Sequence, residues 1–123
     1  MKPRARELTL HLRLMVGREV RIGPGKADLL EGIEKTGSIA AAGRQMQMSY
    51  KRAWSLLDTL NQSFQEPLVR TRKGGRGAGG TTLTPTGKKV LALYRSIEAR
   101  ARRATDRDLA ALGELTRPIR SQT

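Results

Sequence analysis

The chain has 123 residues, a length typical of one domain, and it has no cysteine, which excludes disulfides and thiolate metal sites. No apolar run approaches the roughly 20 residues that span a bilayer, and the N-terminus lacks the apolar centre of a signal peptide, so we expect a cytoplasmic protein. The formal net charge of +13 favours a polyanionic partner such as DNA, RNA or an anionic membrane surface.

The positive charge is concentrated in one segment. Residues 69–90 contain six basic residues and no acidic residue, and the glycine run "GGRGAGG" lies among them. A merely well-solvated basic protein is the alternative interpretation. Solubility alone does not concentrate charge on a glycine loop, so we favour a nucleic-acid contact.

The first predicted element is a half-buried strand. Leucines alternate with polar residues over residues 8–14, which is the period of a strand with one buried face. A second alternating run over residues 19–22 follows Gly17 and predicts a hairpin, which "GPG" ends. His11 is expected on the solvent face, where no other residue would make it a ligand.

Three helices are predicted next. Residues 26–36 have apolar side chains at helical spacing and are followed by Gly37, a usual helix end. Ser38 and Ser49 are the expected N-caps of a short alanine-rich helix and of a third helix. The single tryptophan, Trp54, is expected to pack against the core or the base of the ribbon that follows.

A two-stranded ribbon and a long helix complete the chain. The ribbon is predicted from strands over residues 68–72 and 81–84, and the helix runs over residues 84–115. Because the apolar side chains of this helix repeat every three or four residues, as in a coiled coil, we expect a homodimer. The residues of this seam are Val90, Tyr94, Ile97, Ala101 and Ala104.

This order of elements predicts an α+β winged helix-turn-helix over residues 1–115, followed by a polar tail over residues 116–123. The ribbon is then the wing. Glycines let its backbone approach phosphates, and the basic side chains follow a DNA backbone or enter a minor groove. The wing residues expected on DNA are Arg70, Arg72, Lys73, Gly74, Gly75, Arg76 and Gly77.

The paired motifs "GSIAAA…MSYKRAW" and "LV…GGRGAGG…LTPTG" occur together. Residues 8–94 as a whole resemble the N-terminal DNA-binding domain of the molybdate-responsive ModE-type regulators, a winged helix-turn-helix distantly similar to that of LysR-type proteins. The resemblance implies a transcriptional regulator whose third helix reads the major groove of double-stranded DNA, and whose N-terminal strand and long helix carry dimerisation. The helix residues then expected on DNA are Ser38, Ser49, Tyr50, Lys51, Arg52 and Ser55.

The sequence departs from the family pattern in two places. Gln47 stands where the family usually has a glycine, so a positive φ at this turn would strain the backbone. Complete regulators of this kind continue into molybdate-binding domains, whereas this sequence ends at Thr123. We therefore expect no cofactor in this chain, and a separate molybdate-binding partner stays open.

No enzyme is expected. His11 lacks a nucleophile, and Asp28, Glu31 and Glu34, although they share a helix surface, are interpreted as solvated charge rather than as a metal or acid–base site. The glycine run lacks the spacing of a Walker motif. Two rival functions remain, a sequence-neutral architectural DNA protein and an RNA-binding module. RNA readers usually display stacking aromatic residues, which are few here.

Overall fold

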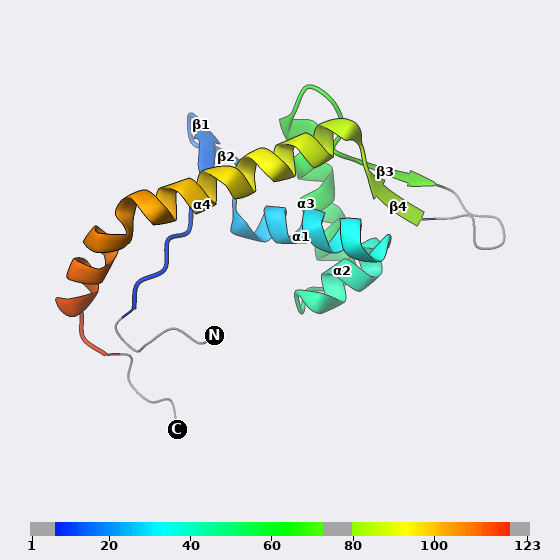
Figure 1. The fold of residues 1–123 in the computed structure, drawn as a ribbon. Helices are drawn as coiled ribbons and strands as arrows, with labels where there is room; N and C mark the ends of the chain where they lie inside the picture. The colour runs from blue at the N-terminus through cyan, green and yellow to red at the C-terminus, as the bar shows by residue number, and fades with distance from the viewer. Residues whose placement is uncertain (1–6, 73–79, 119–123) are drawn as a thin grey trace.

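A computed structural model describes residues 7–72 and 80–118 (Figure 1). Its elements follow the predicted order and confirm the winged helix-turn-helix architecture, with two antiparallel hairpins and four helices in the described part of the chain. They are β1 (Leu14–Val16), β2 (Glu19–Ile22), α1 (Pro24–Thr36), α2 (Ile39–Gln45), α3 (Tyr50–Ser63), β3 (Val69–Arg72), β4 (Gly80–Leu83) and α4 (Pro85–Glu114).

The N-terminal strand is shorter than predicted. Residues 8–14 keep their alternation of half-buried leucines and exposed polar side chains, but only Leu14 belongs to β1. The last residue pair of the hairpin joins Leu14 to Ile22, and the chain then turns into α1 at Pro24. In the part of the chain that the structure describes, no strand pairs with residues 8–13. The alternation of residues thus predicted a half-buried extended segment correctly. A β-strand also needs a hydrogen-bonded partner strand, which alternation alone does not provide.

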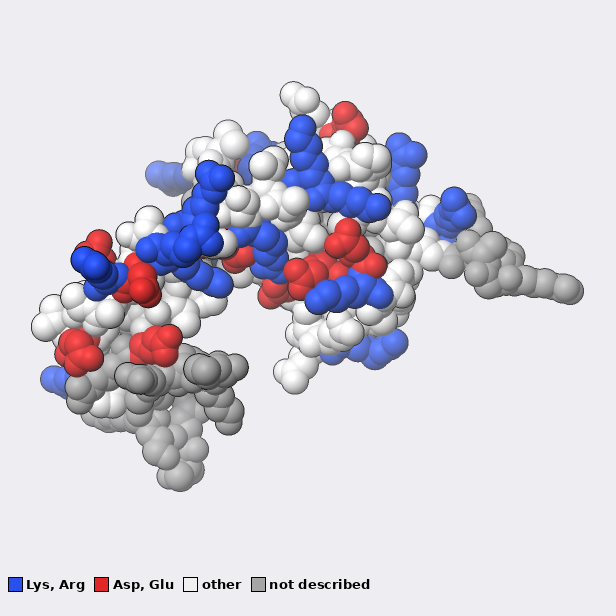
Figure 2. Space-filling model, viewed as in Figure 1, with Lys and Arg blue, Asp and Glu red and all other residues white. Residues whose placement is uncertain are grey.

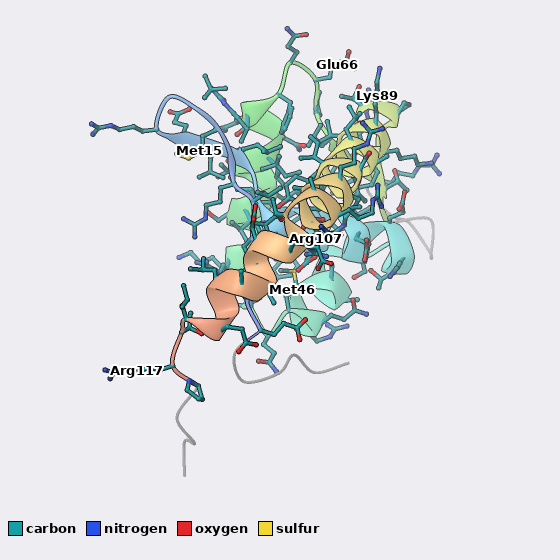
Figure 3. The ribbon with its side chains drawn as sticks, turned by 60° about the vertical axis from the view of Figure 1, so that its left-hand side comes forward. Met15, Met46, Glu66, Lys89, Arg107 and Arg117 are labelled. Atoms are coloured by element: carbon teal, nitrogen blue, oxygen red, sulfur yellow. The ribbon has the colours of Figure 1, made fainter. Side chains whose placement is uncertain are left out.

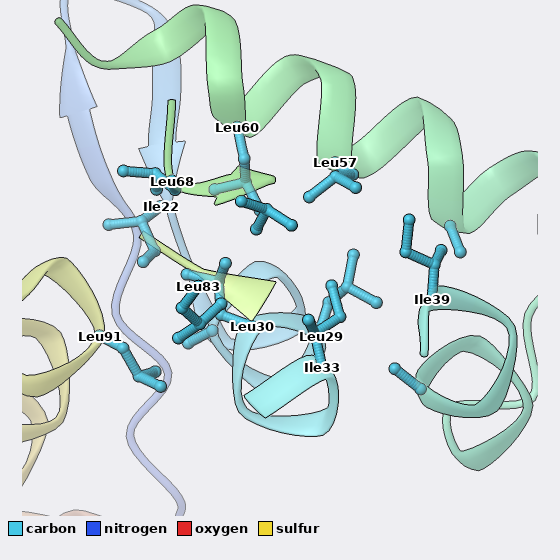
Figure 4. Close-up of a cluster of buried hydrophobic side chains, with 14 of the residues drawn as sticks. Ile22, Leu29, Leu30, Ile33, Ile39, Leu57, Leu60, Leu68, Leu83 and Leu91 are labelled. Atoms are coloured by element: carbon cyan, nitrogen blue, oxygen red, sulfur yellow. The ribbon is translucent and has the colours of Figure 1, made fainter. Parts of the chain in front are cut away.

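The core forms around α1. Leu29, Leu30 and Ile33 are fully buried at 0% exposure. Figure 4 shows these side chains meeting leucines from α3, β4 and α4. This apolar centre holds all the helices except the far half of α4, which extends beyond the other elements (Figure 1).

Small residues let the first three helices approach closely. A Cβ added to Gly32 of α1 would lie 3.0 Å from the Cβ of Ala42 in α2, and one added to Gly43 would lie 3.2 Å from the Cβ of Ala53 in α3. Larger side chains at these two glycines would push the helices apart. Close packing therefore fixes the angle at which α3 is presented.

The helix α4 is tied to the domain by Tyr94, which the sequence analysis placed in a dimer seam. Tyr94 is 1% exposed, and its hydroxyl donates a hydrogen bond to the carbonyl oxygen of Leu12 at 2.7 Å. Burial raises the pKa of this hydroxyl above its ordinary value, so it stays a donor. The seam assignment of Tyr94 was wrong, because the extended segment before β1 covers this side of α4.

An ionic cluster joins α4 to α1. The guanidinium of Arg95 lies 2.8 Å from a carboxylate oxygen of Asp28, 3.3 Å from one of Glu31 and 2.9 Å from one of the buried Glu98. These neighbours raise the pKa of Arg95 further, against the opposing effect of burial. Asp28 and Glu31 are therefore partners of α4 rather than merely solvated, as the sequence analysis had taken them.

Candidate nucleic-acid interface

The caps of α2 and α3 are formed as predicted. The backbone amide of Ala41 donates to the hydroxyl oxygen of Ser38 at 3.1 Å, and that of Arg52 donates to Ser49 at the same distance. Each serine satisfies an amide that the helix itself leaves unpaired. The two hydroxyl groups thus fix where α2 and α3 begin, and α3 starts with its N-terminal end in solvent.

The turn between α2 and α3 has the positive φ whose strain the sequence analysis considered for Gln47. Gln47 has φ 56°, the left-handed region that glycine adopts most easily. The amide of Met48 donates to the carbonyl of Gly43, and that of Gln47 donates to the carbonyl of Arg44. This pair of bonds is the Schellman arrangement, with a glutamine in the position usually held by glycine. The fold keeps the turn in spite of the side chain.

One face of α3 is buried and another is free. Its core face is made of Ala53, Leu57 and Leu60. Tyr50 is 58% exposed, and Lys51, Arg52 and Ser55, which the sequence analysis expected on DNA, are also exposed. Their exposure fits a helix that reads another molecule. The contacts of these residues with DNA stay a prediction.

Trp54 lies outside the buried core, against the first of the two placements predicted for it. Its side chain is 38% exposed, and its ring meets that of Tyr50 edge to face, with centroids 6.0 Å apart and planes at 74°. The core positions on this side of α3 are filled by Ala53 and Leu57, one residue before and three after. Trp54 therefore stays on the free surface beside the basic residues.

The wing presents two arginines on one face. Arg70 pairs with Thr82 and Arg72 with Gly80 in the antiparallel register, so both arginines project from the face opposite the buried Thr81 and Leu83. They line an open hollow together with residues at the base of the wing. Five wing residues named from the sequence lie outside the described residues: Lys73, Gly74, Gly75, Arg76 and Gly77.

Asn61, which the sequence analysis missed, joins α3 to the wing. Its side-chain oxygen accepts hydrogen bonds from the amides of Leu68 at 2.8 Å and Val69 at 3.2 Å, and its amide group donates to the carbonyl of Val69 at 3.3 Å. An asparagine in the last turn of a helix, eight residues before the first residue of a strand, was the available signal. A side-chain amide is one of the few groups that both donates to and accepts from a strand backbone.

Thr84 and Gly87 fix the other end of the wing. The hydroxyl of Thr84 donates to the carbonyl of Pro67 at 2.7 Å and accepts from the amide of Gly87 at 2.9 Å. A Cβ on Gly87 would lie 2.0 Å from the carbonyl oxygen of Leu68, so no other residue fits there without a shift of the backbone. The motif "LTPTG" thus joins the wing to the start of α4.

Among the described residues, the basic side chains of α3 and of the wing strands have no acidic ion-pair partner. The acidic residues of α1 are engaged by Arg95 and Lys35, whereas the ion pairs of residues 7–72 and 80–118 include none of the basic side chains of α3 or of the wing. Figure 2 shows acidic side chains mainly in two groups, one at the centre of the molecule and one toward the far end of α4, and basic ones along α4 and beside the wing. An unneutralised basic side chain is what a phosphate contact requires.

The apolar stripe on α4 differs from the predicted seam. Val90 packs against the core, Ala101 is half-buried, and Ala104 is exposed. Ile97 is 41% exposed, and Leu93, one turn earlier, is 55% exposed although the sequence analysis did not name it. The same helix also carries basic residues, among them Lys89 near its start and Arg107 in its far half (Figure 3). The free apolar stripe is therefore centred on Leu93 and Ile97.

Residues 7–72 and 80–118 offer neither a metal site nor a membrane span. These residues hold no group of three or more histidine or acidic side chains placed to bind a metal ion. No helix of that part of the chain is both long and apolar enough to cross a membrane.

The fold and the exposed α3 define a winged helix-turn-helix protein. The family model described as "Bacterial regulatory helix-turn-helix protein, lysR family" matches residues 27–88, which run from within the first turn of α1 to the start of α4. The chain belongs to this family.

Within the family, the chain resembles ModE-type proteins, as the motifs indicated. It is 46% identical over 88 residues to "Molybdenum transport protein ModE" of Azotobacter vinelandii, covering 72% of this chain and 33% of that protein. It is 43% identical over 79 residues to "Molybdenum-pterin-binding protein MopB" of Rhodobacter capsulatus, covering 64% and 29%. The chain spans about a third of the length of these curated relatives.

Solved structures agree on the fold. The protein of the "CbnR_DBD-DNA complex" superimposes with a TM-score of 0.56 at 24% identity, over 71% of this chain and 94% of that one. The LysR family transcriptional regulator VV2_1132 superimposes with a TM-score of 0.51 at 15% identity, over 66% of this chain and 26% of that one. At these identities the likeness establishes architecture alone.

Proposed function

We propose that this protein is a transcriptional regulator that binds double-stranded DNA in a sequence-specific manner. The observation that carries the proposal is the presentation of α3. Its N-terminal end is capped, exposed and basic, while its other face is fixed in the core by Ala53, Leu57 and Leu60. In helix-turn-helix proteins the N-terminal residues of the second helix contact base edges in the major groove.

The wing is proposed to hold the DNA backbone. Arg70 and Arg72 lie on one face and have no acidic partner among the described ion pairs, and Asn61 holds their strand against α3. Phosphate contacts position a protein on the duplex, and base contacts select the sequence. We include Lys73 and Arg76 of the wing tip in this proposed contact.

A homodimer is proposed on the exposed stripe of Leu93 and Ile97, with Ala101 and Ala104 further along α4. Apolar side chains that are 55% and 41% exposed on one helix favour burial against a second copy. Two recognition helices would then lie about 34 Å apart, on half-sites one helical turn apart. Sedimentation of the Leu93→Glu/Ile97→Glu variant should give a monomer, and the matched exposed variant Ala92→Glu should stay dimeric.

A role in molybdenum homeostasis is the finer part of the proposal. It is supported by relatives whose names refer to molybdenum transport and to molybdenum-pterin binding. Those proteins are about three times as long as the matched region, so molybdate sensing by this chain or by a separate partner is left to experiment.

The deciding experiment is selection from fragmented genomic DNA at about 150 mM salt, with and without molybdate, since affinity depends steeply on salt. Fragments that share spaced half-sites would support the specific regulator and identify its genes. Fragments without a common site would favour the architectural alternative. Stronger competition by duplex RNA than by duplex DNA would favour the RNA-binding one.

Contacts of the wing with phosphates can be recognised by how substitutions change DNA affinity and its dependence on salt. Replacing Arg70 or Arg72 by glutamine should weaken binding to all sequences alike and reduce the salt slope by about 1 for each lost phosphate contact. A loss confined to one base position would instead assign that arginine to base reading.

A further inference from the structure

Two of the four aromatic residues of the chain form an exposed pair on α3. Tyr50 and Trp54 are one helical turn apart, with ring centroids 6.0 Å apart and planes at 74°, and they are 58% and 38% exposed. Solvent-exposed tryptophan is uncommon unless it meets a partner. The core of this domain is complete without either ring.

The pair lies on the flank of α3 that points toward the wing. Asn61 follows Trp54 by seven residues, which places both side chains on the same side of a helix. Asn61 reaches the backbone of β3 from that side. Trp54 and Tyr50 therefore lie on the same side of α3 as Asn61, but closer to the exposed N-terminal end of the helix. Lys51 is next to Tyr50 in the chain.

We propose that Trp54, supported by the ring of Tyr50, contacts the 5-methyl group of a thymine in the major groove. This inference rests on the proposed DNA-binding function and names a base that α3 selects. Among the groups that base pairs present in that groove, the thymine methyl is the apolar one, and apolar side chains recognise it. Duplex bases expose their edges rather than their faces, so the ring meets the methyl group rather than a stacked base.

Charge complementarity favours DNA over a protein as the occupant of this surface. The aromatic pair lies beside Lys51 and Arg52, and Arg70 and Arg72 project from the wing that Asn61 ties to the same helix. An apolar contact surrounded by unpaired cations suits a polyanion that carries a few apolar groups. A thymine-containing duplex has this chemistry.

The first test uses the fact that Trp54 is the only tryptophan, so fluorescence excited at wavelengths that tyrosine does not absorb reports on Trp54 alone. Binding to a fragment recovered by the genomic selection should shield Trp54 from quenching by acrylamide. Non-specific duplex of equal length should shield it less. Equal quenching in the free protein and in the specific complex would overturn the proposal.

The second test replaces each thymine of the recovered site by deoxyuridine, which removes only the 5-methyl group. At one or two positions the wild-type protein should bind about three- to fourfold more weakly, the effect of one buried methyl-sized group. At the same positions the Trp54→Ala variant should bind both duplexes equally, and Trp54→Phe should retain part of the preference. An unchanged wild-type affinity at every position, or an equal loss in Trp54→Ala, would contradict the inference.

The two levels of the proposal fail in different ways. If wild-type protein prefers no site at all, the proposed regulator function fails. If it selects a site but ignores thymine methyl groups, only the role of Trp54 fails. Gln62→Ala, an exposed change on the last turn of α3, is the matched control and should behave as wild type in both tests. Thermal unfolding of each variant checks that its fold is intact.

Discussion

The side-chain oxygen of Asn61 accepts a hydrogen bond from the backbone amide of Leu68 at 2.8 Å, and this bond joins the last turn of α3 to the first residue before the wing strand. The same asparagine also bonds to both backbone groups of Val69. Helix and wing are thereby held in one fixed relation. A duplex that meets both elements meets a preformed surface, which lowers the entropic cost of binding.

Replacing Asn61 by alanine should lower the free energy of unfolding by about 1–3 kcal/mol, since the amide of the buried Leu68 loses its partner. Urea denaturation measures this loss. Asn61→Asp keeps the accepting oxygen and loses the donor, so its effect should be smaller. An Asn61→Ala protein as stable as Gln62→Ala would show that the hydrogen bonds of Asn61 contribute nothing to stability.

Replacing Gln47 by glycine should raise the free energy of unfolding by about 0.5–1 kcal/mol. The left-handed φ of 56° costs a residue with a Cβ about 1–2 kcal/mol, and the greater freedom of glycine in the unfolded chain offsets part of this gain. Thermal unfolding provides the measurement. The neighbouring change Gln45→Gly, inside α2, should instead destabilise the protein by about 1 kcal/mol. Equal effects of the two changes would argue against strain at the turn.

Replacing Gly87 by alanine should destabilise the protein by about 3 kcal/mol, near the upper end for overpacked positions. The added Cβ would lie 2.0 Å from the backbone oxygen of Leu68, which cannot swing aside as a side chain would. Gly25→Ala is the matched control: nothing lies within 4 Å of the added Cβ, so that variant should be neutral or slightly more stable. Denaturant midpoints of the two variants should therefore move in different directions or by very different amounts.

Because of the ionic cluster between α1 and α4, we expect the stability of the protein to fall in acid. Burial acts to raise the pKa of Glu31, but its bonds to Lys35 and the charge of Arg95 outweigh it and hold the pKa below the ordinary 4.5. A carboxyl whose pKa is lowered by folding stabilises the protein above 4.5, and this contribution is lost as pH falls through the lowered value. Unfolding measured from about pH 6 downward should lose stability over that range.

The variant Glu31→Gln should show a weaker dependence on acid than the wild-type protein. The effect should be modest, because the side chain of Glu31 is 38% exposed and solvent screens its charges. Glu34→Gln makes the same change in charge on an exposed residue of α1 and should keep the wild-type profile. If the stability of Glu31→Gln depends on pH as that of the wild-type protein does, Glu31 does not cause the loss of stability in acid.

Local features of the domain were predictable because each depends on residues a few positions away. Ser38 and Ser49 cap their helices as expected, because the amides that they accept from lie three residues further on. Gly37 ends α1 with φ 71°, as a helix-ending glycine should. The possibility of a positive φ at Gln47 came from the resemblance, because ModE-type domains usually have a glycine there, and the structure gives φ 56°. The resemblance to ModE-type domains added the expectation of which helix reads DNA.

The sequence by itself determined the order of elements, the caps, the basic wing and the apolar stripes. Only the tertiary structure decided which side of each stripe is covered. Tyr94 is buried because its hydroxyl meets Leu12, which is 82 positions away, and Trp54 is free because Ala53 and Leu57 already fill the core beside it. Helical periodicity places a side chain on a face, but coverage of that face depends on segments remote in the chain, whose path is set by the packing of the whole domain.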